Sequence, residues 1–237
     1  MAEAPAPTAE RARELARALA ALEQRLAAAC AAAGRRRDEV VLIAVTKTHP
    51  ASDVVALREL GVLDVGENRD PEAKAKAAQV PGVRWHFVGG LQTNKARSVA
   101  AYADVVHSVD RVALVQALSA GAVRADRELD VLLQVSLDGD PDRGGVPVVD
   151  VPELAARAAA APGLRLAGVM AVAPLGADPA GAFAALAEVA GRVRAAHPDA
   201  TAVSAGMSGD LEEAIAAGAT YVRVGTALFG PRPPGLR

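Results

Sequence analysis

Hydrophobic residues along the chain follow two different rhythms, and the change falls near residue 40. Between residues 8 and 33 the residues Leu15, Leu19, Leu22 and Leu26 recur at a helical spacing, with Arg and Glu around the rest of the helix. Gly34 follows at the place where a helix commonly ends in a left-handed cap. This pattern predicts one long helix over 8–33 that covers an end of a globular core. Residues 1–7, rich in Ala and Pro, are expected to form a disordered tail.

From residue 40 onward, short apolar runs typical of strands alternate with stretches of helical periodicity. The apolar runs are 40–46, 62–66, 84–89, 104–109, 129–137, 164–172, 202–206 and 221–225. The helix-like stretches are 51–60, 70–79, 93–101, 111–125, 151–161, 179–197 and 210–218. This alternation favours parallel βαβ units. The runs continue without a linker-like interruption, which predicts an α/β fold with a single (β/α)8 barrel of the TIM type, one domain over 1–237.

A doubly wound open sheet is the competing fold. It is less favoured because "TKTHPASD" follows the first apolar run, where a dinucleotide-binding fold would carry a glycine-rich loop.

The amino-acid composition restricts the classes of binding partner, although it says little about the fold. The net charge of -2 shows no basic excess, so neither nucleic acid nor an anionic membrane is suggested as a partner. The single Cys30 excludes an internal disulfide and a cysteine-based metal site, and we expect it to be a small core residue. No apolar run reaches the length of a membrane span, and the N-terminus carries no signal-peptide pattern. We therefore expect a cytoplasmic protein, and a monomer.

The first apolar run, "VVLIAVTKTHP", ends on Lys47. The simpler explanation is that a buried strand has reached the surface and Lys47 is its first solvated residue. A functional explanation gains weight from composition. The chain has 26 Lys plus Arg, but its lysines are Lys47, Lys74, Lys76 and Lys95. Unlike arginine, a lysine amine can lose its proton and attack a carbonyl carbon.

Polar residues gather at the ends of the apolar runs, which is where the active sites of barrels lie. The strongest local pattern is "SAGMSGDLEEAIAAGATYVRVGTALFG". Ser204, Ser208, Gly225 and Thr226 in this segment offer hydroxyl and backbone N–H groups, at a place where barrels often bind phosphate. Asp210 and Glu213 have the spacing of a capping box at the start of the following helix. Alternatively, both loops are turns and caps only.

A phosphate site that faces a reactive lysine across a barrel mouth suggests pyridoxal 5'-phosphate (PLP). Lys47 would hold its aldehyde as an aldimine, and Arg223 would face the pyridine nitrogen. Because a guanidinium only donates hydrogen bonds, it would leave that nitrogen unprotonated and weaken the cofactor as an electron sink.

The segments "AVTKTHPASDV", "DVGEN", "RWHFVGGLQTNK" and the Ser204–Gly230 segment together resemble the pyridoxal phosphate homeostasis protein family. The resemblance covers the chain from residue 40 onward and implies a single PLP barrel, similar to the N-terminal domain of alanine racemase. It implies that Lys47 forms the aldimine, that Asn68 lies beside the cofactor and that Arg223 meets the pyridine nitrogen. It also implies the following sites: phosphate at Ser204, Ser208, Gly225 and Thr226, and a pocket lined by His86, Met170 and Met207. "GENRDPE" and "DGDPDRGG" depart from the family's usual pattern.

A racemase of this fold needs a second acid/base on the opposite face of the bound amino acid. The sequence ends at Arg237, soon after the last strand, so we expect the domain that supplies this group to be lacking. A non-catalytic role in PLP homeostasis and delivery, with apo PLP-dependent enzymes as recipients, is therefore favoured. The alternatives are a weak PLP-dependent amino-acid racemase or lyase, and a Schiff-base aldolase that binds a phosphosugar.

Overall fold

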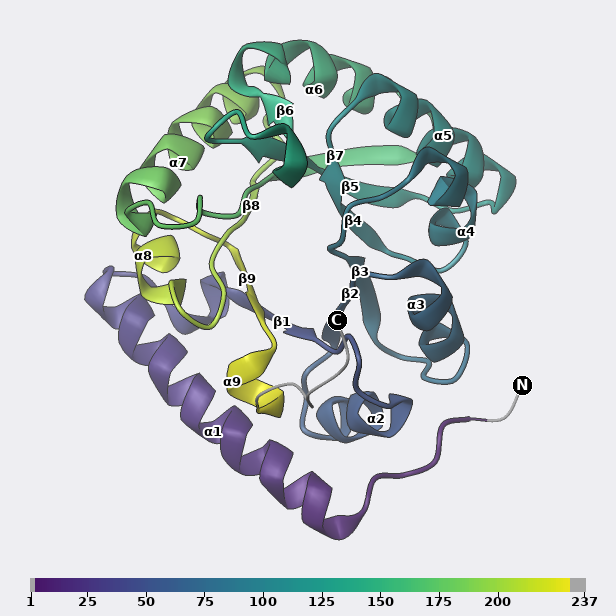
Figure 1. The fold of residues 1–237 in the computed structure, drawn as a ribbon, viewed down its shortest axis with the longest axis vertical. Coiled ribbons are helices and arrows are strands. Elements are labelled where there is room, and N and C mark those ends of the chain that lie inside the picture. Colours follow the sequence, from purple (N-terminus) through teal and green to yellow (C-terminus); the bar gives the residue numbers. More distant parts are fainter. Residues whose placement is uncertain (1–2, 231–237) are drawn as a thin grey trace.

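The computed structural model describes residues 3–230, and within them eight parallel strands close into a barrel surrounded by helices (Figure 1). The barrel strands are β1 (Val41–Val45), β2 (Asp64–Glu67), β3 (Arg84–Phe87), β4 (Val105–Val109), β5 (Leu129–Ser136), β7 (Leu164–Met170), β8 (Ala202–Ser204) and β9 (Tyr221–Val224). They pair in chain order, and β1 pairs with β9 to complete the ring. The predicted TIM-type barrel is confirmed, and the open sheet is wrong.

Helices connect the strands and form the outer layer of the barrel (Figure 1). They are α2 (Ala51–Glu59), α3 (Asp70–Ala77), α4 (Ala96–Ala100), α5 (Val112–Arg124), α6 (Val151–Ala159), α7 (Pro179–Ala196) and α8 (Leu211–Ala216). Each lies in a stretch where helical periodicity predicts a helix. Among the strands and α-helices of residues 3–230, two short ones have no counterpart among the predictions: β6 (Val146–Pro147), which pairs with β5 outside the ring, and α9 (Thr226–Phe229). Both are too short to carry a periodic pattern.

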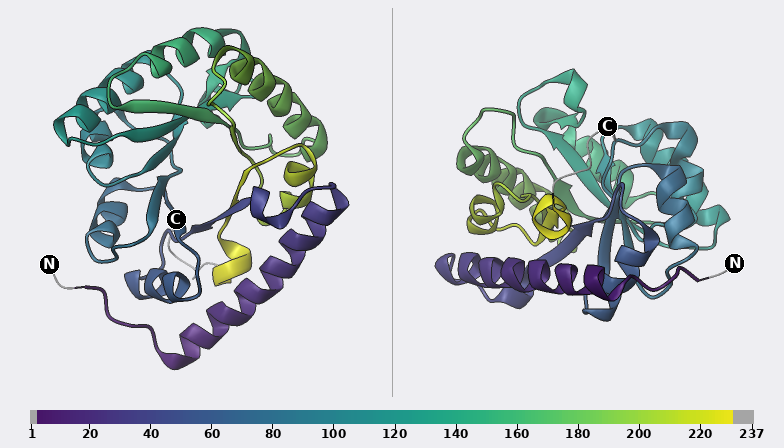
Figure 2. Two further views of the ribbon diagram at one scale, coloured as in Figure 1. Left: turned by 180° about the vertical axis from the view of Figure 1, so that it is seen from behind. Right: turned by 60° about the horizontal axis from the view of Figure 1, so that its bottom comes forward.

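The N-terminal helix α1 (Ala9–Ala32) lies along one side of the barrel, against α2, α8 and α9 (Figure 2). Its first turn is capped by the Thr8 hydroxyl, which accepts a hydrogen bond from the backbone N–H of Arg11 at 3.2 Å. The four leucines of the predicted stripe are buried together with Cys30, as expected. Burial of a leucine side chain contributes about 2 kcal/mol, so this stripe accounts for the position of the helix.

The barrel interior holds a small apolar cluster of Val105, Leu132, Ala167 and Met170. The larger apolar layer lies between the strands and the helices. Because the interior cluster is small, the barrel has room for polar side chains along its axis, and these are joined by hydrogen bonds.

The residues before α1 contact the barrel. The backbone N–H of Ala4 donates to the carbonyl oxygen of Gln79 at 3.1 Å, and Ala4 packs near Trp85. Residues 1 and 2 of the tail expected over 1–7 lie outside the described part of the chain, and the disorder of the tail stays a prediction. Among the described residues, no helix has both the length and the apolar character that a membrane crossing requires.

Candidate ligand-binding site

A cavity of about 420 Å³ opens at the carboxyl ends of the barrel strands. This volume falls in the range of sites that bind small molecules, and the position is the one where barrels carry their active sites. Seven of the predicted site residues line it: Lys47, Asn68, Met207, Ser208, Arg223, Gly225 and Thr226. Residues that we did not expect also contribute, namely Val45, Val88, Gly89, Val172 and Gly209.

Lys47 lies two residues beyond the end of β1, in a short turn with an unusual backbone. The next residue, Thr48, has φ of 69°, in the left-handed region that β-branched residues rarely adopt. The backbone N–H of Thr48 donates to Glu72 Oε1 at 2.6 Å, which holds this conformation in place. The turn that carries Lys47 is therefore fixed by a side chain from α3.

A buried lysine organises this turn from below. Lys76 on α3 donates from Nζ to the carbonyl oxygen of Thr46 at 2.7 Å, to Glu67 Oε1 at 2.6 Å and to Glu72 Oε1 at 2.7 Å. The Thr46 hydroxyl also donates to Glu67 Oε1, at 2.6 Å. The ammonium thus contacts Thr46 directly, and through Glu72 it is linked to the N–H of Thr48, so it holds the residues on either side of Lys47 in the sequence.

Glu67 is the deepest carboxyl group of this cluster, with 1% of its surface exposed. Burial raises the pKa of Glu67 above its usual value, although the Lys76 charge opposes the shift. Sequence reasoning missed this cluster. The scarcity of lysine that singled out Lys47 applies equally to Lys76, and the Glu72 to Lys76 spacing is that of an ion pair on one helix face.

Asn68 enters the cavity directly after β2, and Gly89 lies against it. A β-carbon added at Gly89 would lie 2.4 Å from the carbonyl oxygen of Asn68, well inside van der Waals contact. Only glycine permits this approach of the two loops. The backbone position of Asn68 therefore depends on Gly89.

Another side of the cavity is formed by the loops after β8 and β9, the latter strand being the neighbour of β1. Ser208 Oγ accepts a hydrogen bond from the backbone N–H of Ala227 at 3.3 Å, which joins the two loops. Arg25 of α1 donates to the carbonyl oxygen of Ser208 at 2.7 Å and pairs with Glu212. The hydroxyl groups of Ser208 and Thr226 at this wall suit an anion such as phosphate.

The predicted capping box in this region does not form. Asp210 is the N-cap residue of α8, but its side chain makes no capping hydrogen bond to the helix. Its Oδ1 instead accepts from the backbone N–H of Met207 at 2.6 Å. Asp210 therefore shapes the loop that lines the cavity instead of capping the helix.

Arg223 forms part of the cavity wall although only 6% of its surface is exposed. Nη1 donates to Ser204 Oγ at 2.5 Å, and Nη2 donates to the carbonyl oxygen of Ala171 at 3.0 Å. Burial lowers the pKa of Arg223 to about 10, against the opposing charge of Asp210, so the guanidinium stays protonated at neutral pH. A fixed positive donor therefore faces whatever the cavity holds.

Three predicted residues lie deeper in the barrel than we expected. Ser204, His86 and Met170 are buried and do not line the cavity. The Ser204 hydroxyl is engaged by Arg223 and His107, and its contact with a phosphate stays a prediction.

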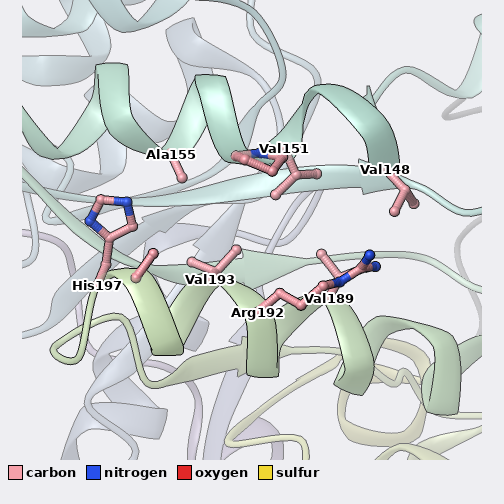
Figure 3. Close-up of a pocket in the computed structure, with 9 residues that line it drawn as sticks. Val148, Val151, Ala155, Val189, Arg192, Val193 and His197 are labelled. Atoms are coloured by element: carbon pink, nitrogen blue, oxygen red, sulfur yellow. The ribbon is translucent and has the colours of Figure 1, made fainter.

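A second cavity, between α6 and α7 on the outside of the barrel, does not compete with this site (Figure 3). It measures about 80 Å³ and is lined by apolar side chains together with Arg192 and His197. That volume is far below what a small-molecule site needs. We therefore assign ligand binding to the cavity at Lys47.

Residues 18–233 match the protein family described as "Alanine racemase, N-terminal domain". The chain is 47% identical over 244 residues to the pyridoxal phosphate homeostasis protein of Mycobacterium tuberculosis, which covers 94% of this chain and 95% of that protein. It is 36% identical over 231 residues to the protein of the same name from Escherichia coli, with coverage of 92% and 97%. The structure of PipY from Synechococcus elongatus with PLP bound superposes with a TM-score of 0.77 at 34% identity, over 91% of this chain and all of that one.

The fold and these matches define the class first: a barrel of the kind that forms the N-terminal domain of alanine racemase. Within that class, the chain belongs to the pyridoxal phosphate homeostasis protein family. The resemblance inferred from the sequence motifs is thereby confirmed.

Proposed function

We propose that the chain binds PLP in the cavity at the carboxyl ends of the strands and serves PLP homeostasis inside the cell. Lys47 would hold the aldehyde covalently through Nζ, with the carbonyl oxygen released as water. Ser208, Gly225 and Thr226 would hold the phosphate, Asn68 would lie beside the ring, and Met207 would line the mouth of the cavity.

The observation that carries this proposal is that three kinds of functional group, an amine, hydroxyl groups and a guanidinium, line one cavity. Lys47, the hydroxyl groups of Ser208 and Thr226, and the buried Arg223 guanidinium all line the same cavity. An aldehyde, a phosphate and a ring nitrogen are the polar groups of PLP, so the residues fit the ligand. The PLP-bound PipY structure and the homeostasis proteins that this chain matches support the same assignment.

We infer that the role is one of storage and delivery rather than catalysis. Arg223 is a donor only, so a pyridine nitrogen facing it stays unprotonated, and PLP bound this way is a weak electron sink. Formation of a carbanion needs that sink and a placed base. Apo forms of PLP-dependent enzymes are the recipients in this proposal, and a monomer suffices for it.

Two assays on the PLP-loaded protein test the role. In the first, the protein is incubated with a panel of L-amino acids in deuterated water, and exchange of the Cα proton and racemisation are followed by NMR and chiral chromatography. In the second, it is mixed with apo PLP enzymes, and the recovered activity is measured against free PLP at the same concentration. We expect negligible exchange together with productive transfer. Multiple turnovers per second on any amino acid would contradict the carrier role.

A further inference from the structure

Five polar side chains on five different strands form a continuous hydrogen-bonded chain through the barrel interior. Asp64 Oδ1 lies 2.8 Å from His86 Nε2, and His86 Nδ1 lies 2.9 Å from His107 Nε2. His107 Nδ1 lies 2.9 Å from Ser204 Oγ, which accepts from Arg223 Nη1 at 2.5 Å. The chain crosses β2, β3, β4, β8 and β9.

The two ends of this chain fix the direction of every bond within it. The Asp64 carboxylate only accepts, so neutral His86 carries its proton on Nε2 and accepts on Nδ1. His107 therefore donates from Nε2 to His86 Nδ1, and its own Nδ1 accepts from the Ser204 hydroxyl. The Ser204 oxygen accepts from Arg223, which only donates. Every hydrogen bond from Arg223 to Asp64 therefore runs in the same direction, with each donor paired to an acceptor.

The middle residues of the hydrogen-bonded chain are deeply buried and neutral. Ser204, His86 and His107 are each at most 1% exposed. Burial lowers the pKa of both imidazoles, that of His107 well below its usual value, and the Asp64 carboxylate opposes the shift at His86. A positive charge therefore stands at one end of the chain and a carboxylate at the other, with uncharged groups between them.

Other groups hold the chain on its sides. Tyr221 packs edge-on against both imidazoles, with ring centroids 5.6 Å from His86 and 5.9 Å from His107. Arg84, whose charge also disfavours protonated imidazoles, is held by Tyr221 and by the Asp130 carboxylate. Asp104 faces the same end of the barrel and accepts from the backbone of Trp85 and from Arg127.

The two ends of the hydrogen-bonded chain, Arg223 and Asp64, lie in two different depressions of the molecule. Arg223 lines the cavity at the carboxyl ends of the strands. Asp64 lines a wide opening at the other end of the barrel, together with Arg84 and Asp104. The hydrogen-bonded chain thus connects the candidate PLP site with solvent at the opposite mouth.

We propose that Asp64, His86, His107 and Ser204 are positioning residues that orient the Arg223 guanidinium toward the ligand and anchor it to the far mouth of the barrel. The part of this proposal that concerns PLP rests on the proposed function. The direction of the hydrogen bonds does not, because it follows from the protein alone. Loss of Asp64 removes the acceptor that sets the tautomers of His86 and His107. Arg223 is thereby held less firmly, although Asp64 does not contact it.

The first test uses the ligand-free protein and nitrogen-15 NMR of its histidines. We expect His86 and His107 both to be neutral, with the proton on Nε2. His197, the C-cap residue of α7, serves as a reference outside the hydrogen-bonded chain. In Asp64→Ala the His86 signals should change to a mixture of tautomers. A proton on Nδ1 of either chain histidine in the unmodified protein would overturn the proposal, whether or not PLP binds.

The second test uses the PLP-loaded protein and its visible spectrum. Asp64→Ala should shift the absorption band of the bound ligand and weaken PLP retention by about tenfold, the loss expected when a charged donor loses its orienting bond. Asp64→Asn keeps an acceptor and should restore the band. The control Asp104→Ala removes a carboxylate at the same mouth but outside the chain. It should lower thermal stability without a band shift. Equal spectra for Asp64→Ala and the unmodified protein, or an equal shift in Asp104→Ala, would overturn the proposal.

Discussion

Replacement of Lys76 by methionine isolates the buried cluster beneath Lys47. Methionine has similar length and apolar character but no charge, so the variant deletes three hydrogen bonds with little change of volume. Glu67 then keeps the hydrogen bond from Thr46. However, within residues 3–230 its Oε2 has no hydrogen-bond partner, so the carboxylate loses its main compensation. The turn that carries Lys47 loses the contact at Thr46 as well.

The expected cost is about 3–5 kcal/mol, the range for removal of one partner from a buried ion pair. Its pH dependence has a definite sign. The pKa of Glu67 is already raised by burial, and Lys76 is the charge that opposes the rise, so the variant raises it further. A carboxyl group whose pKa is raised on folding contributes stability that is present at low pH and is lost as the pH increases through the folded value. The destabilisation should therefore be larger at about pH 8 than at about pH 5.

Urea unfolding followed by circular dichroism at both pH values measures this difference. Lys74→Met, an exposed position on the same helix, is the matched control and should change stability by less than about 0.5 kcal/mol. The double variant Lys76→Met with Glu67→Gln should recover part of the loss, because glutamine carries no charge to bury and can still accept from Thr46. A loss that is the same at both pH values, or that the second substitution deepens, would refute the reasoning.

Two further predictions concern the walls of the cavity. Ser208→Ala and Thr226→Val should each weaken PLP binding by about 1 kcal/mol, while pyridoxal, which lacks the phosphate, should be nearly unaffected in parallel titrations; equal losses for both ligands would count against the phosphate site. Gly89→Ala should cost about 1–3 kcal/mol of stability and reduce PLP affinity, because the new methyl group displaces Asn68. Gly90→Ala, where an added β-carbon meets nothing within 4 Å, should be neutral in both measurements, and equal effects at the two glycines would argue against the steric explanation.

The barrel could be predicted from the sequence because its signals are local and repeated. Mostly apolar runs alternate with helical stretches along the chain, so the order of elements follows from periodicity alone. The short elements escaped prediction for the same reason. β6 has two residues and α9 has four, and segments this short are not long enough for a periodic pattern to be recognised.

The candidate site could be predicted as far as the ends of strands identify it. Lys47, Ser208 and Thr226 lie two to four residues beyond the ends of strands, and the structure brings them to one cavity. The sequence shows that Ser204 stands near a strand end but not how deep its hydroxyl lies in the barrel, where it is buried and contacts Arg223 and His107. The Lys76 cluster and the Asp64 to Arg223 chain depend on side chains from elements far apart in the sequence. Only the closed barrel brings these groups together.

The central claim is that Lys47 binds PLP covalently, and mapping of the reduced adduct tests it most directly. The protein is incubated with PLP, the C=N bond is reduced with borohydride, and proteolytic peptides are analysed by mass spectrometry. The phosphopyridoxyl group should be found on the peptide that contains Lys47, and Lys47→Ala should show neither this adduct nor the visible absorption band while remaining folded. An adduct on Lys74, Lys76 or Lys95, with the band retained in Lys47→Ala, would contradict the assignment.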